Sequence, residues 1–87
     1  MAIKSEIAWI KRLEDGTKLA VYARRFGREW TFYSRGRRND IWQEISEPTR
    51  EDWDTLLDAV RRRVPRSLFP PDEVTRIQNT IRERFQE

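Results

Sequence analysis

Hydrophobic and polar residues alternate along the first part of the chain, which is the pattern of β-strands. Apolar side chains recur with a period of two at Ile3, Ile7, Trp9 and Leu13. The alternation resumes after Glu14-Asp15-Gly16, where glycine can adopt the positive φ of a tight turn. We therefore predict two antiparallel strands, residues 3–13 and 17–26, joined as a hairpin.

The length of this turn decides which residues face each other across the hairpin. A two-residue loop would place Trp9 opposite Tyr22 and mix polar with apolar positions. A three-residue loop that ends at Gly16 places Trp9 opposite Val21 and keeps one face apolar. Because a slip of one residue turns every side chain to the other face, we predict the three-residue loop.

A second turn, Gly27-Arg28, leads to a third strand at residues 29–35. Glycine as the first residue of a two-residue loop suits a type II′ turn, and this turn places Tyr22 opposite Tyr33. A short fourth strand is predicted at residues 41–45. The result is an antiparallel meander whose apolar face carries Ile7, Trp9, Leu13, Leu19, Val21, Ala23, Trp30 and Phe32.

The spacing of apolar residues becomes helical after the fourth strand. Thr49 can cap the free backbone N–H groups of a first helix, residues 50–63, and Pro65 stops it. Pro71 fits the first position of a second helix, residues 71–85, because proline lacks the N–H group that is unbonded there. The two apolar stripes are Trp53, Leu56, Leu57, Val60 and Val64, and Val74, Ile77, Ile81 and Phe85.

A sheet with one apolar face and two amphipathic helices indicates the α+β class. We predict a single two-layer domain over residues 1–87, in which an antiparallel meander of three to four strands carries both C-terminal helices on one face. The core is expected to contain Trp9, Val21, Trp30, Phe32, Trp53, Leu57, Val60, Ile77 and Ile81.

Composition excludes several kinds of chemistry. The 87 residues include no cysteine and no histidine, which removes disulfides, thiol catalysis, cysteine metal sites and the usual general base. Glu51, Asp52 and Asp54 cluster, but a helix N-terminus attracts acidic residues for electrostatic reasons alone. We expect a protein that is not an enzyme and has no metal or cofactor. No apolar run approaches the roughly 18–20 residues of a membrane span, so we expect a cytoplasmic protein without a membrane partner.

Positive charge is concentrated in the first half of the chain. Residues 1–45 carry ten basic and six acidic side chains, whereas residues 46–87 carry eight basic and nine acidic ones. Arginine outnumbers lysine fifteen to three, which favours contacts with phosphates and aromatic rings. A codon bias towards arginine would produce the same excess without a function.

The sheet face opposite the apolar one carries the candidate binding residues. In the predicted register this surface, which we call the tyrosine face, carries among others Lys4, Ala8, Ile10, Arg12, Tyr22, Arg24, Thr31, Tyr33 and Arg35. Opposed tyrosines bordered by arginines are typical of surfaces that bind single-stranded nucleic acid. Our hypothesis is that nucleic acid contacts Tyr22, Arg24, Tyr33, Arg35, Arg37 and Arg38.

Two other interpretations of the tyrosine face stay open. A cross-strand tyrosine pair stabilises a sheet without any ligand, by about 0.2–1 kcal/mol. An exposed aromatic face also suits a contact with another protein or a homodimer. A strand meander followed by a helix resembles in outline the single-stranded-DNA-binding folds of transcriptional coactivators and Pur-type proteins, although no sequence motif of either group occurs and this chain adds a second helix.

Two clusters of arginine suggest different roles. The loop from Arg35 to Arg38 would crowd like charges unless an anion relieved them. The first helix ends with a second cluster, where cations complement the helix dipole. Its members are Arg61, Arg62, Arg63 and Arg66.

Overall fold

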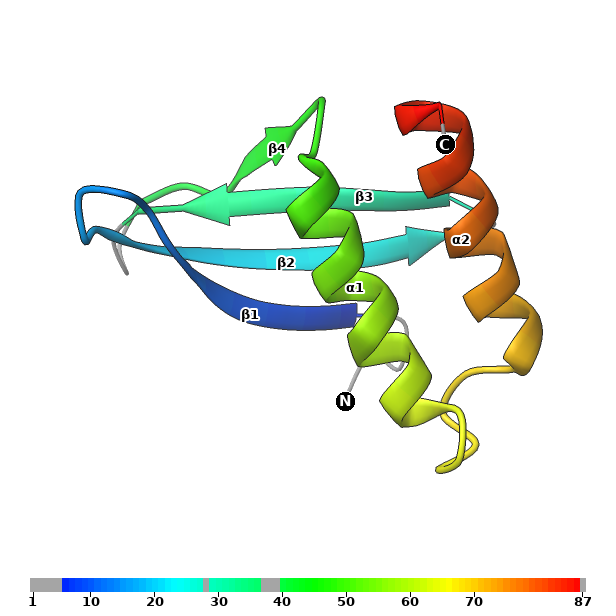
Figure 1. Ribbon diagram of the computed structural model, residues 1–87. Helices are drawn as coiled ribbons and strands as arrows, with labels where there is room; N and C mark the ends of the chain where they lie inside the picture. Colours follow the sequence, from blue (N-terminus) through cyan, green and yellow to red (C-terminus); the bar gives the residue numbers. More distant parts are fainter. Residues whose placement is uncertain (1–5, 28, 37–39, 87) are drawn as a thin grey trace. The chain divides into compact units, whose positions relative to one another are not determined.

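The computed structural model describes residues 6–27, 29–36 and 40–86. Its elements are, in chain order, β1 (Glu6–Arg12), β2 (Lys18–Phe26), β3 (Glu29–Arg35), β4 (Gln43–Ile45), α1 (Arg50–Arg63) and α2 (Pro71–Phe85) (Figure 1). The chain divides into two compact units, residues 1–47 with the sheet and residues 48–87 with the helices. An antiparallel four-stranded sheet followed by two helices confirms the predicted α+β class.

The sheet is a meander with the strand order β1-β2-β3-β4. The predicted fourth strand forms, but it contains only the three residues of β4 and pairs Phe32 with Ile45. β1 ends at Arg12, one residue earlier than predicted. Predicted strand residues 3–5 lie outside the described residues.

The first hairpin has the predicted register, with Trp9 opposite Val21. At its turn the N–H of Leu13 donates to the carbonyl oxygen of Thr17 at 2.8 Å, and the N–H of Gly16 donates to that of Leu13 at 3.0 Å. Gly16 has a φ of +88°, which a residue with a β-carbon adopts only at a cost. The position of this glycine therefore fixes the three-residue loop and the pairing of the strands.

The second hairpin also has the predicted register, and it places Tyr22 opposite Tyr33. Gly27 begins its loop with a φ of +62°, as a turn with glycine in first position requires. The other loop residue, Arg28, lies outside the described residues, so the type II′ assignment stays a prediction.

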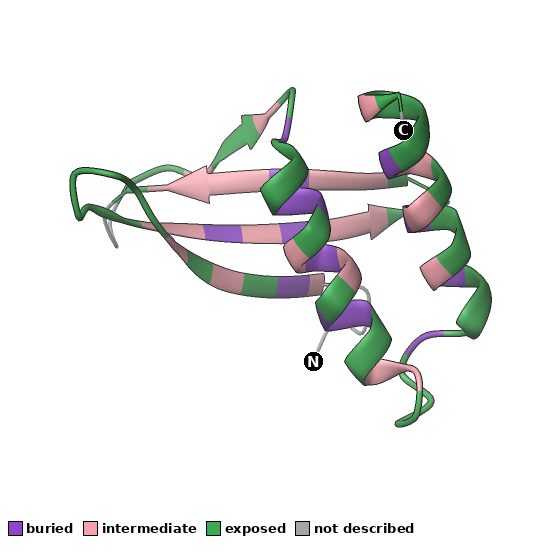
Figure 2. Cartoon of the chain, viewed as in Figure 1, coloured by how far each residue is buried: buried purple, intermediate pink, exposed green. Residues whose placement is uncertain are grey.

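Burial alternates along β1 and in the middle of β2, as a period of two requires (Figure 2). The fully buried side chains of the sheet share the apolar face and are Ile7, Val21, Ala23 and Phe32. Trp9 and Trp30 were expected in the core but are only half-buried, because Trp9 lies on the edge strand and Trp30 near the end of a hairpin. Leu13 is 38% exposed. Its predicted place in the buried face was wrong, because it belongs to the turn.

The two helices begin and end at the predicted residues. Thr49 and Asp52 form a capping box: each side chain accepts a hydrogen bond from the other residue's backbone N–H, both at 3.2 Å. This box satisfies two N–H groups that a helix start leaves unbonded. Pro71 occupies the first turn of α2, as predicted. Asp52, one of the acidic residues at the start of α1, thus has a structural role.

Helices α1 and α2 pack against each other. The buried apolar residues of this unit are Trp53, Leu56, Ala59, Val60, Phe69, Ile77 and Ile81. The prediction that Leu57 belongs to the core was wrong: it is half-buried and lies at the margin of the stripe. Leu56 and Val60, both with no exposed area, lie at the centre of that stripe. Phe69 is buried although it lies in the connector between the helices, where no periodicity marks it.

Candidate functional site

The tyrosine face is organised around one row of side chains that crosses the sheet. The register aligns Ala8 with Tyr22, Tyr22 with Tyr33, and Tyr33 with Glu44. The rings of Tyr22 and Tyr33 stack with centroids 4.7 Å apart and an angle of 22° between their planes. Both tyrosines are half-buried. The sequence therefore predicted the position of this pair correctly.

A third ring that the sequence did not assign to this face joins the tyrosine pair. Trp42 lies immediately before β4, and its ring meets that of Tyr22 edge-on, with centroids 4.6 Å apart and planes at 79°. The signal for it was an aromatic residue within the predicted strand 41–45. Without a register for that short strand, the sequence could not show which face the ring would join.

Arginine side chains lie over these rings. The guanidinium of Arg35 lies 4.4 Å from the centroid of Trp42. That of Arg24 lies 5.6 Å from the centroid of Tyr22 and 5.9 Å from that of Phe26. Cations over aromatic faces at such distances are attracted by the ring quadrupole. We call Tyr22, Arg24, Tyr33, Arg35 and Trp42 the aromatic–arginine cluster.

Arg24 differs from Arg35 because it also has an acidic partner. Its Nη2 and Nε donate to Oε2 of Glu6, at 2.7 Å and 3.1 Å, across β1 and β2. This hydrogen bonding to the carboxylate raises the pKa of Arg24 above its ordinary value. The charge of Arg24 is thus balanced within the sheet, and the ion pair holds its guanidinium beside the ring of Tyr22.

Positive charge on the tyrosine face gathers at one end. Arg12 lies opposite Lys18, and Arg35 lies in the neighbouring row, opposite Ala20. We call Arg12, Lys18 and Arg35 the basic end. The register places the described acidic residues of this face in other rows, and they are Glu6, Glu29 and Glu44.

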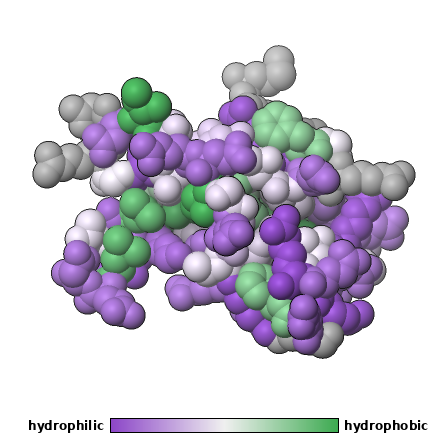
Figure 3. Space-filling view, turned by 90° about the horizontal axis from the view of Figure 1, so that it is seen from above, coloured by the Kyte–Doolittle hydropathy of each residue, from purple (hydrophilic) through white to green (hydrophobic). Residues whose placement is uncertain are grey.

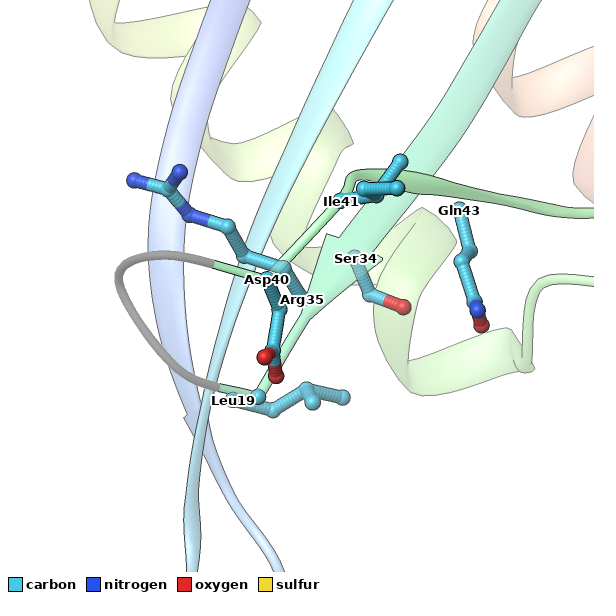
Figure 4. A pocket seen from close by; sticks show the side chains of 7 residues that line it. Leu19, Ser34, Arg35, Asp40, Ile41 and Gln43 are labelled. Atoms are coloured by element: carbon cyan, nitrogen blue, oxygen red, sulfur yellow. The ribbon is translucent and has the colours of Figure 1, made fainter.

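Beyond the basic end, β3 continues into the loop that precedes β4. Arg37 and Arg38, which the sequence suggested as phosphate contacts, lie outside the described residues. A pocket of about 470 Å³ lies beside this loop and is lined in part by Ser34, Asp40 and Gln43. The guanidinium of Arg35 extends away from the side chains of Ser34 and Gln43 (Figure 4). Arg35 is among the residues that line the pocket, but its guanidinium does not lie beside the hydroxyl of Ser34 or the amide of Gln43.

Two of the four arginines in the cluster at the end of α1, Arg62 and Arg63, have partners within their own helix. Arg62 forms an ion pair with Asp58, with Nε 3.3 Å from Oδ2. Nη1 of Arg63 donates to the carbonyl oxygen of Ala59 at 2.9 Å. These contacts agree with the interpretation that the cluster stabilises the helix terminus.

Some large hydrophobic side chains of the described residues are exposed. In the view of Figure 3, hydrophobic side chains lie in several separate areas among hydrophilic ones. Among the described residues, the large hydrophobic side chains that are exposed are those of Ile10, Leu13, Phe26, Ile41 and Leu68. Ile10 and Phe26 belong by register to the tyrosine face, so apolar, aromatic and charged side chains are mixed on it.

The tyrosine face supplies aromatic rings and guanidinium groups, which are groups that bind ligands. Among residues 6–27, 29–36 and 40–86, no group of three or more acidic side chains is placed to hold a metal ion. Within the described part of the chain, no helix has the length and apolar character needed to cross a membrane. Comparison with protein-family models, curated proteins and solved structures finds no significant match. The chemistry of the tyrosine face is therefore the basis for assigning a function.

Proposed function

We propose that this protein is a non-enzymatic module that binds single-stranded nucleic acid on its tyrosine face. The observation that carries the proposal is a continuous series of ring and cation contacts that runs from Tyr33 through Tyr22 and Trp42 to Arg35. The series ends where the face becomes basic. Surfaces that combine aromatic platforms with cations bind single strands by stacking on bases and neutralising phosphates.

Bases and phosphates use different parts of this surface. Unpaired bases stack on the half-buried rings of Tyr33 and Trp42, and phosphates lie near Lys18 and Arg35 at the basic end. A duplex hides the faces of its bases, whereas a single strand can turn them onto a protein ring. The aromatic rings therefore favour a single-stranded ligand over a double-stranded one.

Arg24 has a positioning role in this proposal. Its charge is already paired with Glu6 at 2.7 Å, and a phosphate would have to compete with that carboxylate. The same ion pair fixes the guanidinium beside Tyr22 and so supports the ring on which the stack is built. Lys18, which lies outside this ion pair, is the better choice for testing phosphate contact.

Replacing Lys18 with Ala is expected to reduce the salt dependence of nucleic-acid binding. Each phosphate contact with a single strand contributes about 0.7 to the slope of log affinity against log salt concentration. Titration of a fluorescent oligothymidylate over a series of salt concentrations should show a slope less steep by about that amount. Arg66→Ala is the matched control, because it removes one exposed positive charge outside the tyrosine face.

Equal slopes for Lys18→Ala and the wild-type protein would place the phosphate contacts elsewhere. If Arg66→Ala changed the slope as much as Lys18→Ala, binding would depend on net charge and not on the basic end. Affinity no better than millimolar at low salt would reject the nucleic-acid proposal and leave the tyrosine face to a protein partner.

A further inference from the structure

β1 is an edge strand: among the described strands, only β2 pairs with it. The N–H of Leu13 is directed at Thr17 across the hairpin, and the direction of backbone groups alternates along an antiparallel strand. The even-numbered residues of β1 therefore direct their N–H and C=O groups away from the sheet. Such a row is a template for a further strand.

The side chains of this row form a pattern that is complementary to itself. Ala8 and the 65% exposed Ile10 lie in the middle, with Glu6 at one end and Arg12 at the other. Edge strands are commonly protected from pairing by proline, a bulge or a central charge. The middle of this row, Ala8 and Ile10, has neither a charged residue nor a proline.

We propose that a second copy of this chain pairs with this edge, β1 against β1 in antiparallel orientation, with Trp9 at the two-fold axis. Glu6 of each copy then lies opposite Arg12 of the other, and Ala8 opposite Ile10. Opposite charges directly across antiparallel strands stabilise the pairing. The interface is isologous, so each of these contacts occurs twice.

Charge selects this register over its neighbours. The even-numbered residues of one copy must pair with even-numbered residues of the other, because these residues direct their backbone groups outward. The two nearest alternative registers therefore shift the partner of each residue by two positions. In one alternative Ala8 meets Ala8 and Glu6 meets Ile10; in the other Ile10 meets Ile10 and Ala8 meets Arg12. Both alternative registers move Glu6 away from Arg12 of the other copy, whereas the proposed register places each Glu6 opposite an Arg12.

The opposite face of the strand is compatible with the same axis. Trp9 lies on the apolar face, where its ring meets Phe32 edge-on with centroids 6.0 Å apart. At the axis the two Trp9 residues form a pair without backbone hydrogen bonds, which is the arrangement that brings side chains closest. Aromatic cross-strand pairs add to sheet stability. The two sheets become continuous, with both tyrosine faces on one side.

Charge reversal tests the register. Glu6→Lys and Arg12→Glu each place like charges opposite one another across the interface, so each variant alone should dimerise about tenfold more weakly or worse. Because Glu6→Lys also breaks the ion pair with Arg24 within the chain, the register is assigned by recovery in a mixture and not by the loss alone. An equimolar mixture of the two variants pairs opposite charges at both ends and should recover the affinity. Lys18→Glu is the control: it makes the same charge change opposite Arg12 but away from the edge, and should leave the dimer intact.

The dissociation constants are measured by analytical ultracentrifugation at low salt. Ile10→Pro removes an outward N–H without removing a bond to β2, and it should give a folded monomer whose circular dichroism is unchanged. Ile10→Thr keeps that N–H and should still dimerise. A wild-type protein that stays monomeric at millimolar concentration overturns the inference. So does a dimer that Ile10→Pro and the charge reversals leave unchanged.

Discussion

Replacing Leu56 with Ala is expected to lower the free energy of unfolding by about 2–5 kcal/mol, the range for fully buried leucines. Leu56 has no exposed area and lies at the centre of the buried stripe of α1. Its loss leaves a cavity that a structure of two short packed helices fills only in part. The measurement is urea denaturation followed by the helical circular dichroism signal.

Leu57→Ala is the matched control, because it removes the same atoms one position further along α1. Leu57 is half-buried, so its removal loses less burial and should cost about 1 kcal/mol or less. If the two variants lost equal stability, or if Leu57→Ala lost more, Leu56 would not lie at the centre of the buried face of α1, and this account of the helix would be wrong.

Replacing Trp42 with Ala is expected to weaken binding of an oligothymidylate by about 1–3 kcal/mol, which corresponds to between roughly fivefold and more than a hundredfold in Kd. The substitution removes the ring that Arg35 covers at 4.4 Å and that meets Tyr22 edge-on. Because stacking depends little on salt, the loss should be present at low and at high salt concentration. Fluorescence anisotropy with a labelled oligonucleotide measures both.

Ile41→Ala is the control for this loss, since Ile41 precedes Trp42 directly and is 84% exposed. It should bind the oligonucleotide as the wild-type protein does. Trp42→Phe, which keeps an aromatic face, should recover most of the affinity. Equal binding by Trp42→Ala and the wild-type protein would mean that the ring contributes to the sheet and not to a ligand.

The register of the hairpins could be predicted because two constraints coincide. Of the two-residue and three-residue loops, only the three-residue loop keeps the apolar residues of β1 and β2 on one face, and Gly16 stands where that loop needs a positive φ. The helix bounds were equally accessible, because Thr49 caps α1 and Pro71 starts α2. In both cases local backbone chemistry and the hydrophobic period give the same answer.

Other features depend on contacts that sequence spacing does not encode. Leu56 and Leu57 both fit a helical stripe, and only packing shows which of them is central. The position of Trp42 depends on the pairing of a strand with only three residues. The register places Arg24 opposite Glu6, so their proximity could be predicted. Only the geometry shows that Glu6 balances the charge of Arg24, which the sequence suggested as a contact for nucleic acid.

The indole N–H signals of the four tryptophans give the most direct test of binding by the tyrosine face. In a two-dimensional nitrogen–proton NMR spectrum, stepwise addition of an oligothymidylate at low salt should shift the signal of Trp42. The signals of Trp9 and Trp30, on the apolar face, and of buried Trp53 should stay in place. If no indole signal moved at millimolar oligonucleotide, or if Trp30 moved while Trp42 did not, the tyrosine face would not be the nucleic-acid-binding surface.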